Sequence, residues 1–426
     1  MSSAPLPPGR SGLPLLGETL AFAKNPFRFI DERLAAHGRV FRTHVLGRKT
    51  VVVAGPEAAG RFIDGSVVMR EGSMPPHVQE LFGGRSLPLL DGDAHAARKG
   101  IVLQAFTREA MAAYVPIIQR TIERYFAKWS GAGEIRWLDE MKRLAIEVIC
   151  TTFLGLQAGE EMDRLRRDYD VLTSGFATLP INLPGTPYRK ALKARDRILA
   201  VLRRIVRERR AAPADDGLSR ILAGTDIGDD DLALELHHIV VAGFIVYGEL
   251  VAIVRQLTEH PELRARLGDR ESLLEFVNEV KRVTPIVPVV FGKTRNPFEL
   301  DGMSVPAGWM LLWAVTPSHT THGVYSEPAR FDPERFSPAR AEERRHEHAF
   351  APQGAGPITG HRCPGLDFAT SVMALFTTEL LRHTWELPPQ NFEYDWSKVP
   401  PEVADRLRAR VGLGSHLENQ LNGGPR

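Results

Sequence analysis

Five long segments of the sequence carry apolar residues at intervals of three and four, the spacing that places them on one face of an α-helix. These segments are residues 105–130, 137–155, 188–210, 231–258 and 366–383. Short β-branched or apolar runs bounded by turn residues predict strands at 39–45, 50–54, 287–290, 298–300 and 309–315. The pattern therefore predicts a mainly α fold with a minor β portion.

The length and the charge balance limit the possible architectures and partners. The chain has 426 residues, so length alone allows two or three domains or one large domain. The 54 Lys and Arg residues nearly balance the 52 Asp and Glu residues, and neither sign is concentrated in one half. We therefore expect no nucleic-acid partner.

The longest apolar run, Ile239 to Val254, is interrupted by Gly243, Gly248 and Glu249. It is shorter than the roughly 18 uncharged residues that a membrane span needs, so we expect a buried helix and no membrane span. The N-terminal segment is rich in Pro and Gly and lacks the basic start and apolar stretch of a signal peptide. A cytoplasmic location is therefore expected.

Only two cysteines are present, which excludes a disulfide framework and a four-thiolate zinc site. Cys150 lies in an apolar helical segment and is expected to fill the core. Cys363 lies in the glycine-dense loop 350–365, directly before a helical segment and beside Arg362 and His361. Positive charge and a helix N-terminus favour a thiolate there. It could be a nucleophile, with His361 or His95 as its base, or a metal ligand.

A second pattern combines Glu279 and Arg282, three residues apart at the end of a helix, with Arg335 of the later Pro-Glu-Arg-Phe sequence. The first two side chains share a helix face and can pair, and Arg335 can join them. Each motif alone is weak evidence. Their order and separation from the Cys363 loop make the combination specific.

This combination resembles the cytochromes P-450, the heme-thiolate monooxygenases. The resemblance covers nearly the whole chain, including the Pro- and Gly-rich entry segment and the early hairpin, and implies a single domain over residues 1–426 with the cytochrome P-450 fold. It implies heme b with Cys363 as the axial iron ligand, and a structural triad of Glu279, Arg282 and Arg335. The residues it implies around the heme are His95, Lys99, His361, Arg295, Ala242, Gly243, Phe350 and Gly356.

The sequence departs from the family in two places. Most members carry an acid–alcohol pair in the long helix, but apolar residues replace it after Ala242-Gly243. Glu249 or Tyr247 could supply protons if the helix bulges there, although pairing of Glu249 with Arg255 or another neighbour is the simpler interpretation. The Cys363 loop is similar to that of the bacterial fatty-acid peroxygenases, yet Val241-Ala242 stands in place of their Arg-Pro pair.

The segment 179–195 resembles the lid of retinoid- and steroid-oxidising members and favours a bulky apolar substrate. The residues expected to line the substrate pocket are Leu87, Leu179, Ile181, Phe244, Val246, Val287 and Val289. The expected function is hydroxylation or related oxidation of a lipid, terpenoid or other secondary metabolite, with electrons from a ferredoxin and ferredoxin reductase type donor. The alternatives are an enzyme that uses peroxide or catalyses a rearrangement, and a non-catalytic heme protein that binds a ligand or partner.

Three histidine pairs lack a third ligand at metal spacing and are expected to be solvated or capping residues. They are His237-His238, His319 with His322, and His346 with His348.

Overall fold

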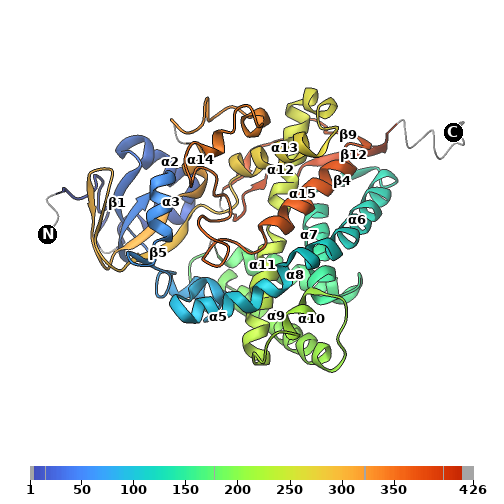
Figure 1. Ribbon diagram of the computed structural model, residues 1–426, viewed down its shortest axis with the longest axis horizontal. Coiled ribbons are helices and arrows are strands. Elements are labelled where there is room, and N and C mark those ends of the chain that lie inside the picture. The colour runs from blue at the N-terminus through green and yellow to red at the C-terminus, as the bar shows by residue number, and fades with distance from the viewer. Residues whose placement is uncertain (1–3, 15, 177, 321–322, 397, 415–426) are drawn as a thin grey trace, which may run out of the picture.

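The computed structural model describes residues 4–14, 16–176, 178–320, 323–396 and 398–414. One group of strands lies with the N-terminal helices at one side of the molecule, long helices form most of the rest, and a second group of strands lies near the C-terminus at the other side (Figure 1). The α-helices are α1 (Thr19–Lys24), α2 (Pro26–His37), α3 (Pro56–Ile63), α4 (Pro76–Leu81), α5 (Gly92–Leu103), α6 (Arg108–Ser130), α7 (Trp137–Leu154), α8 (Glu160–Gly175), α9 (Pro187–Ala211), α10 (Gly217–Leu222), α11 (Asp229–Phe244), α12 (Tyr247–Glu259), α13 (Arg270–Val283), α14 (Val315–His319) and α15 (Leu366–Leu380). The short 3-10 helices are η1 (Leu87–Leu89), η2 (Gln104–Phe106), η3 (Pro261–Ala265), η4 (Pro333–Phe336) and η5 (Glu342–Arg344).

The main sheet has five strands in the order β1 (Val40–Val45), β2 (Arg48–Val53), β8 (Met310–Trp313), β5 (Val290–Thr294) and β3 (Val68–Met69). The predicted hairpin is confirmed, with Val40 opposite Val53 and Val45 opposite Arg48. Its turn residues Leu46 and Gly47 both have positive φ, which matches the twist of a tight hairpin. The shorter strands are β4 (Glu134–Arg136), β6 (Phe298–Leu300), β7 (Met303–Val305), β9 (His383–Glu386), β10 (Tyr394–Asp395), β11 (Glu402–Val403) and β12 (Arg408–Leu413).

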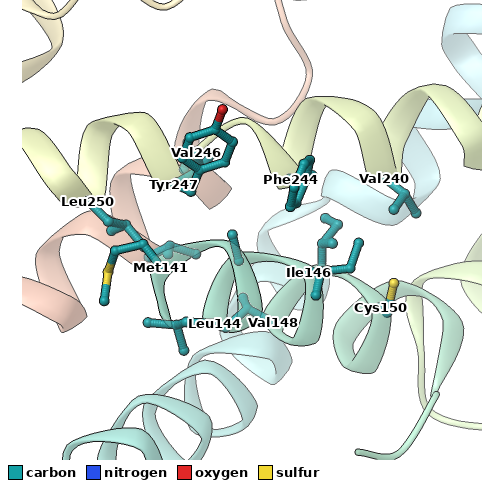
Figure 2. Packing of buried hydrophobic residues seen from close by; sticks show 14 of the residues in the cluster. Met141, Leu144, Ile146, Val148, Cys150, Val240, Phe244, Val246, Tyr247 and Leu250 are labelled. Atoms are coloured by element: carbon teal, nitrogen blue, oxygen red, sulfur yellow. The ribbon is translucent and has the colours of Figure 1, made fainter. Parts of the chain in front are cut away.

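The five predicted helical segments all form helices, and α7 lies at the centre of the largest apolar core. Cys150 on α7 is fully buried among apolar side chains, as expected from its sequence (Figure 2). Burial raises the pKa of its thiol well above the usual range, so Cys150 stays protonated and acts as a small apolar residue. The mainly α fold with a minor β portion is therefore confirmed.

Two predicted boundaries are wrong. The strand expected at 287–290 is β5 at Val290–Thr294, because Pro288 has no N–H to donate to a sheet. The helix expected at 231–258 is interrupted, since α11 ends at Phe244 and α12 begins at Tyr247. At the interruption the Gly248 nitrogen donates to the Ile245 carbonyl oxygen at 3.1 Å, which is the spacing of a 3-10 turn.

Helices α11 and α12 together, Asp229–Glu259, are long and apolar enough to cross a membrane by length and composition. In the most apolar window of that segment, 72% of the residues are buried inside the protein. The bent pair Gly92–Phe106 and Arg108–Ser130 passes the same test only if it is counted as one span. Burial of the α11–α12 segment matches the predicted core helix, and the absence of a membrane span stays a prediction.

Candidate functional site

Cys363 lies in the loop that ends directly before α15. Its backbone nitrogen donates to the Gln353 carbonyl oxygen at 2.9 Å, which closes the loop. Gly354 supports this turn with a φ of 94° that residues with a side chain rarely adopt. Burial raises the pKa of the Cys363 thiol, and the Gly365 amide, Lys99 and Lys281 lower it by less. The Gly365 amide, at the start of α15, thus favours the thiolate as expected, but burial has the larger effect.

Two cavities meet at Cys363. The larger has about 1110 Å³ of empty space and the smaller about 890 Å³, open solvent included. The residues that line both are Arg70, Ala242, Val246, Val290, Gln353, His361 and Cys363. The sulfur of Cys363 therefore faces a space bounded on its other side by α11 and α12.

Imidazole and cationic side chains gather along the edge of the larger cavity. The His95 and His361 rings lie 4.0 Å apart, and Lys99 Nζ donates to the Arg362 carbonyl oxygen at 2.5 Å. Burial is the largest cause that lowers the pKa of His95 to about 4 and of Lys99 to about 8. Within the described part of the chain, buried His95 Nε2 has no hydrogen-bond partner.

These residues fit the group that the sequence resemblance implies. Heme b is a largely apolar macrocycle with two carboxylates, and it needs apolar walls, donors for the carboxylates and an axial ligand. The unpartnered His95 Nε2, Lys99, His361 and the buried Arg70 supply such donors near Cys363. The three residues expected at this edge from the sequence, His95, Lys99 and His361, are thus brought together.

The structure also brings Glu279, Arg282 and Arg335 together behind the loop. Arg282 Nε donates to Glu279 Oε2 at 2.6 Å, and Arg335 Nε donates to Glu279 Oε1 at 3.1 Å. All three side chains are fully buried. Arg335 Nη1 also donates to Glu342 at 2.9 Å, which gives the second guanidinium a carboxylate that the sequence did not indicate. The pairs attach α13 to η4 and η5.

Glu249 projects into the smaller cavity from α12. It is 5% exposed, and within the described part of the chain its Oε2 has no hydrogen-bond partner. Burial raises its pKa, and the nearby Lys281 ammonium lowers it by less. The expected pairing with Arg255 is wrong, because Arg255 Nε donates to Glu259 at 2.6 Å instead.

Tyr247 and Phe244 lie on the opposite side of the α11–α12 segment from the cavities. The Tyr247 hydroxyl donates to Glu402 Oε1 at 3.3 Å, so its candidacy as a proton donor at this site is wrong. The Phe244 ring packs 5.3 Å from Tyr247 in the core between α11 and α7, so it is wrong as a pocket residue (Figure 2). Val246, between them, does line both cavities.

Of the other expected pocket residues, Leu87 and Val287 line the cavities. Val289 is buried instead in a separate core cluster with Phe41. Leu179 and Ile181 are 56% and 47% exposed, so their apolar character does not place them in the pocket. These three expectations are therefore wrong.

Three expected heme contacts also lie elsewhere. Arg295 is exposed on the turn after β5. The Phe350 ring packs 4.9 Å from Phe336. A Cβ at Gly356 would lie 2.9 Å from Ile63 Cδ1, so this glycine allows the loop to pack on α3. Gly354, not Gly356, lines a cavity.

Ala242 and Gly243 both reach the larger cavity, as expected. A Cβ at Gly243 would lie 2.5 Å from Ile149 Cδ1 on α7. The glycine is therefore needed for the close approach of α11 to α7, whereas Ala242 presents its methyl group to the cavities.

Sequence reasoning missed the polar residues Arg70, Glu235, His238 and Lys281, which lie at or beside the cavities. The sequence did contain a signal for Glu235 and His238. Residues 235, 238, 239 and 242 share one helical face, so the two polar residues could have been expected beside Ala242 at the cavity.

The histidine pairs are not uniformly solvated or capping. His237 is buried, and its Nε2 lies 3.2 Å from the Leu81 carbonyl oxygen. His319 is buried and its Nε2 accepts from the Ala351 nitrogen at 3.0 Å, while His322 lies outside the described residues. Across the described ranges, no group of three or more His, Cys, Asp or Glu side chains is placed to hold a metal ion.

Comparison with known proteins gives consistent matches over the whole chain. The family model described as cytochrome P450 matches residues 7–245 and 246–398. The putative cytochrome P450 120 of Synechocystis sp. is 28% identical over 96% of this chain and 98% of its own length. Abscisic acid 8'-hydroxylase 1 of Arabidopsis thaliana is 28% identical over 91% of this chain and 87% of its own length. The solved structure of retinoic acid bound cyanobacterial CYP120A1 has a TM-score of 0.88 and 27% identity, and covers 96% of this chain and 100% of that chain.

Proposed function

The chain belongs to the cytochrome P450 family, and on that premise we propose that it hydroxylates, or oxidises in a related way, a lipid, terpenoid or other secondary metabolite. The family and its relatives establish the coarser statement: this is a heme b monooxygenase of hydrophobic small molecules. The observation that carries the proposal is the half-buried Cys363, which faces two largely apolar cavities bounded by α11 and α12.

The heme and the protein side chains would have different roles in the reaction. When bound, heme b supplies the oxidation, with an axial thiolate that favours O–O cleavage. Cys363 would bind the iron, and His95, Lys99, His361 and Arg70 would hold the heme carboxylates. The apolar side chains of Ile239 on α11, Val246 in the turn after it and Val290 on β5 line the larger cavity and would orient the substrate and exclude water from it.

Relatives support an apolar substrate with few polar groups. One is named for abscisic acid, and one solved structure holds retinoic acid. Both molecules are largely apolar carbon skeletons that carry an acid group. The larger cavity here has the same character, with apolar side chains of α5, α7, α11 and α15 on its walls.

Glu249 is the proton-holding residue that we propose in place of the missing acid–alcohol pair. Its unpartnered Oε2 is buried at the smaller cavity, which shares Cys363 with the larger one. Lys281 stabilises the ionised form, and its Nζ is itself fixed by donating to Gln353 Oε1 and Thr370 Oγ1 at 3.1 and 2.7 Å. Burial favours the neutral form of this carboxyl and one cation favours its ionised form, so the group can both hold and release a proton.

Electrons from a ferredoxin-type donor, with dioxygen, are proposed over peroxide as the oxidant. The cavity face of α11 presents Ala242 where a peroxide-using relative would hold a carboxylate with Arg-Pro. Turnover with peroxide alone, compared with turnover with a ferredoxin, its reductase and oxygen, tests this choice. Faster turnover with peroxide alone would reverse it.

The substrate class is tested by optical titration of the heme-loaded protein. Fatty acids, terpenoids including abscisic and retinoic acids, and aromatic metabolites are added one at a time, and the spin-state change of the heme is followed. We expect saturable changes with terpenoids or lipids. Saturable changes with small polar aromatics alone would contradict the proposal.

A further inference from the structure

The larger cavity has a polar end on α11, away from the Cys363 loop. Glu235 and His238 lie one turn apart on the helix face that lines the cavity, followed by Ile239 and Ala242. His238 is four residues before Ala242, or about 6 Å along the helix axis, and Ala242 also lines the smaller cavity beside Cys363. The polar end is therefore within the reach of one small molecule that also approaches the heme site.

His238 has an unused hydrogen-bonding atom at this end. Its Nδ1 is buried, and it has no hydrogen-bond partner within the described ranges. Burial, with smaller effects of His237 and Lys99, lowers the pKa of His238 to about 3, so the ring is neutral at physiological pH. One face of the ring packs 5.2 Å from Phe82, which restricts its orientation. A buried polar atom without a partner is costly, so it favours a ligand that supplies one.

The charged groups around His238 already have protein partners. Glu235 accepts from the Leu87 nitrogen at 3.0 Å and from Arg98 Nη1 at 2.9 Å. Arg98 Nη2 donates to Asp231 at 3.0 Å. The Lys99 ammonium donates to the Arg362 carbonyl oxygen, toward the Cys363 loop. The polar end therefore offers a neutral hydrogen-bonding atom beside a committed carboxylate, and no cation of α11 is directed at it.

We propose that His238 selects a neutral alcohol: an apolar molecule whose hydroxyl group bonds His238 Nδ1 while its carbon skeleton extends along α11 toward Ala242 and Val246. This rests on the proposed function and names its substrate class. A hydroxyl both donates and accepts, so it suits either tautomer of the imidazole. Arg98 and Lys99 already have protein partners, so a ligand carboxylate would be buried at this end without a cation of its own, which is costly.

Matched ligands test the selection. The heme-loaded full chain is titrated with farnesol, farnesoic acid and farnesene, and with tetradecanol and tetradecanoic acid, and dissociation constants are measured from the heme spectrum and by equilibrium dialysis. We expect each alcohol to bind at least about fivefold more tightly than the acid of the same skeleton, which is the scale of one hydrogen bond.

Variants separate His238 from the general shape of the cavity. His238→Leu should weaken alcohol binding about fivefold while leaving farnesene binding unchanged, and His238→Gln should restore much of it through its amide. Ile239→Val, on the same helix face, is the matched control and should change the dissociation constants of alcohols, acids and farnesene by the same factor.

Two results would overturn the inference: acids that bind as tightly as alcohols, or alcohol binding that His238→Leu leaves unchanged. If the heme-loaded protein bound none of these ligands, both this inference and the proposed function would fail. If it bound acids, alcohols and hydrocarbon equally, only the inference would fail.

Discussion

Single buried polar atoms determine most of the chemistry that this chain can do. Glu249 Oε2 and His95 Nε2 have no partners among the described residues, and both lie at cavities that contain Cys363. The sequence indicated Glu249 only through its place about one turn further along the predicted long helix than the missing acid–alcohol pair, and it indicated Tyr247 equally. What separates them is the helix interruption at Ile245–Val246, which no local sequence pattern revealed.

Replacing Glu249 by Gln keeps the side-chain shape but removes the titrating proton. We expect less product per electron by about tenfold or more, and a matching rise in released peroxide. Heme content and substrate affinity should stay the same. Product and peroxide are measured together in turnover with oxygen and an electron donor.

The control for this prediction is Tyr247→Phe. The Tyr247 hydroxyl bonds Glu402 away from the cavities, so the coupling of electrons to product should not change. Unchanged coupling in Glu249→Gln would remove Glu249 from the reaction.

At the scale of elements, the close contact of α11 with α7 positions the cavity face of α11. A Cβ at Gly243 would lie 2.5 Å from Ile149 Cδ1, closer than packed carbon atoms approach. Gly243→Ala should therefore destabilise the heme-loaded protein by about 1–3 kcal/mol, measured by urea unfolding.

Gly100→Ala is the matched control, because Gly100 also lies within a helix but a Cβ there meets nothing within 4 Å. It should be neutral or stabilise by up to about 1 kcal/mol. Ile149→Ala combined with Gly243→Ala should give a smaller loss than the sum of both changes. Fully additive losses would show that the contact does not limit the position of α11.

The helices were predictable at this scale because their apolar periodicity is strong. The start of β5 depends on Pro288, whose missing N–H was not taken into account, and the break in α11–α12 depends on packing with distant segments. The pocket residues were less predictable for the same reason. Leu179 and Ile181 have the composition of a pocket wall but are exposed, while Phe244 is turned into the core. Motif residues with fixed partners, such as Glu279 and Arg335, were predictable because their chemistry requires a specific pairing.

For the whole molecule, the buried ion pairs of Glu279, Arg282 and Arg335 join α13 to the segment that contains η4 and η5. Arg335→Leu leaves the carboxylates of Glu279 and Glu342 buried without this guanidinium. The free energy of unfolding should fall by about 3–5 kcal/mol. Urea unfolding followed by circular dichroism measures it.

Arg330→Ala provides the comparison, since the Arg330–Glu327 pair is exposed on both sides. Its effect should stay below about 0.5 kcal/mol. Arg335→Lys keeps the positive charge, so its loss in the free energy of unfolding should lie between those of Arg335→Leu and Arg330→Ala. A loss for Arg335→Leu no larger than that for Arg330→Ala would contradict a structural role of the triad.

The axial role of Cys363 is the central claim, and the absorbance spectrum of the reduced carbon monoxide complex tests it most directly. The protein and a Cys150→Ser variant should both give the spectrum of a thiolate-ligated heme, because Cys150 is a buried core residue. Cys363→His should retain heme but lose the thiolate spectrum and the monooxygenase activity. A thiolate spectrum that persists in Cys363→His would contradict the account.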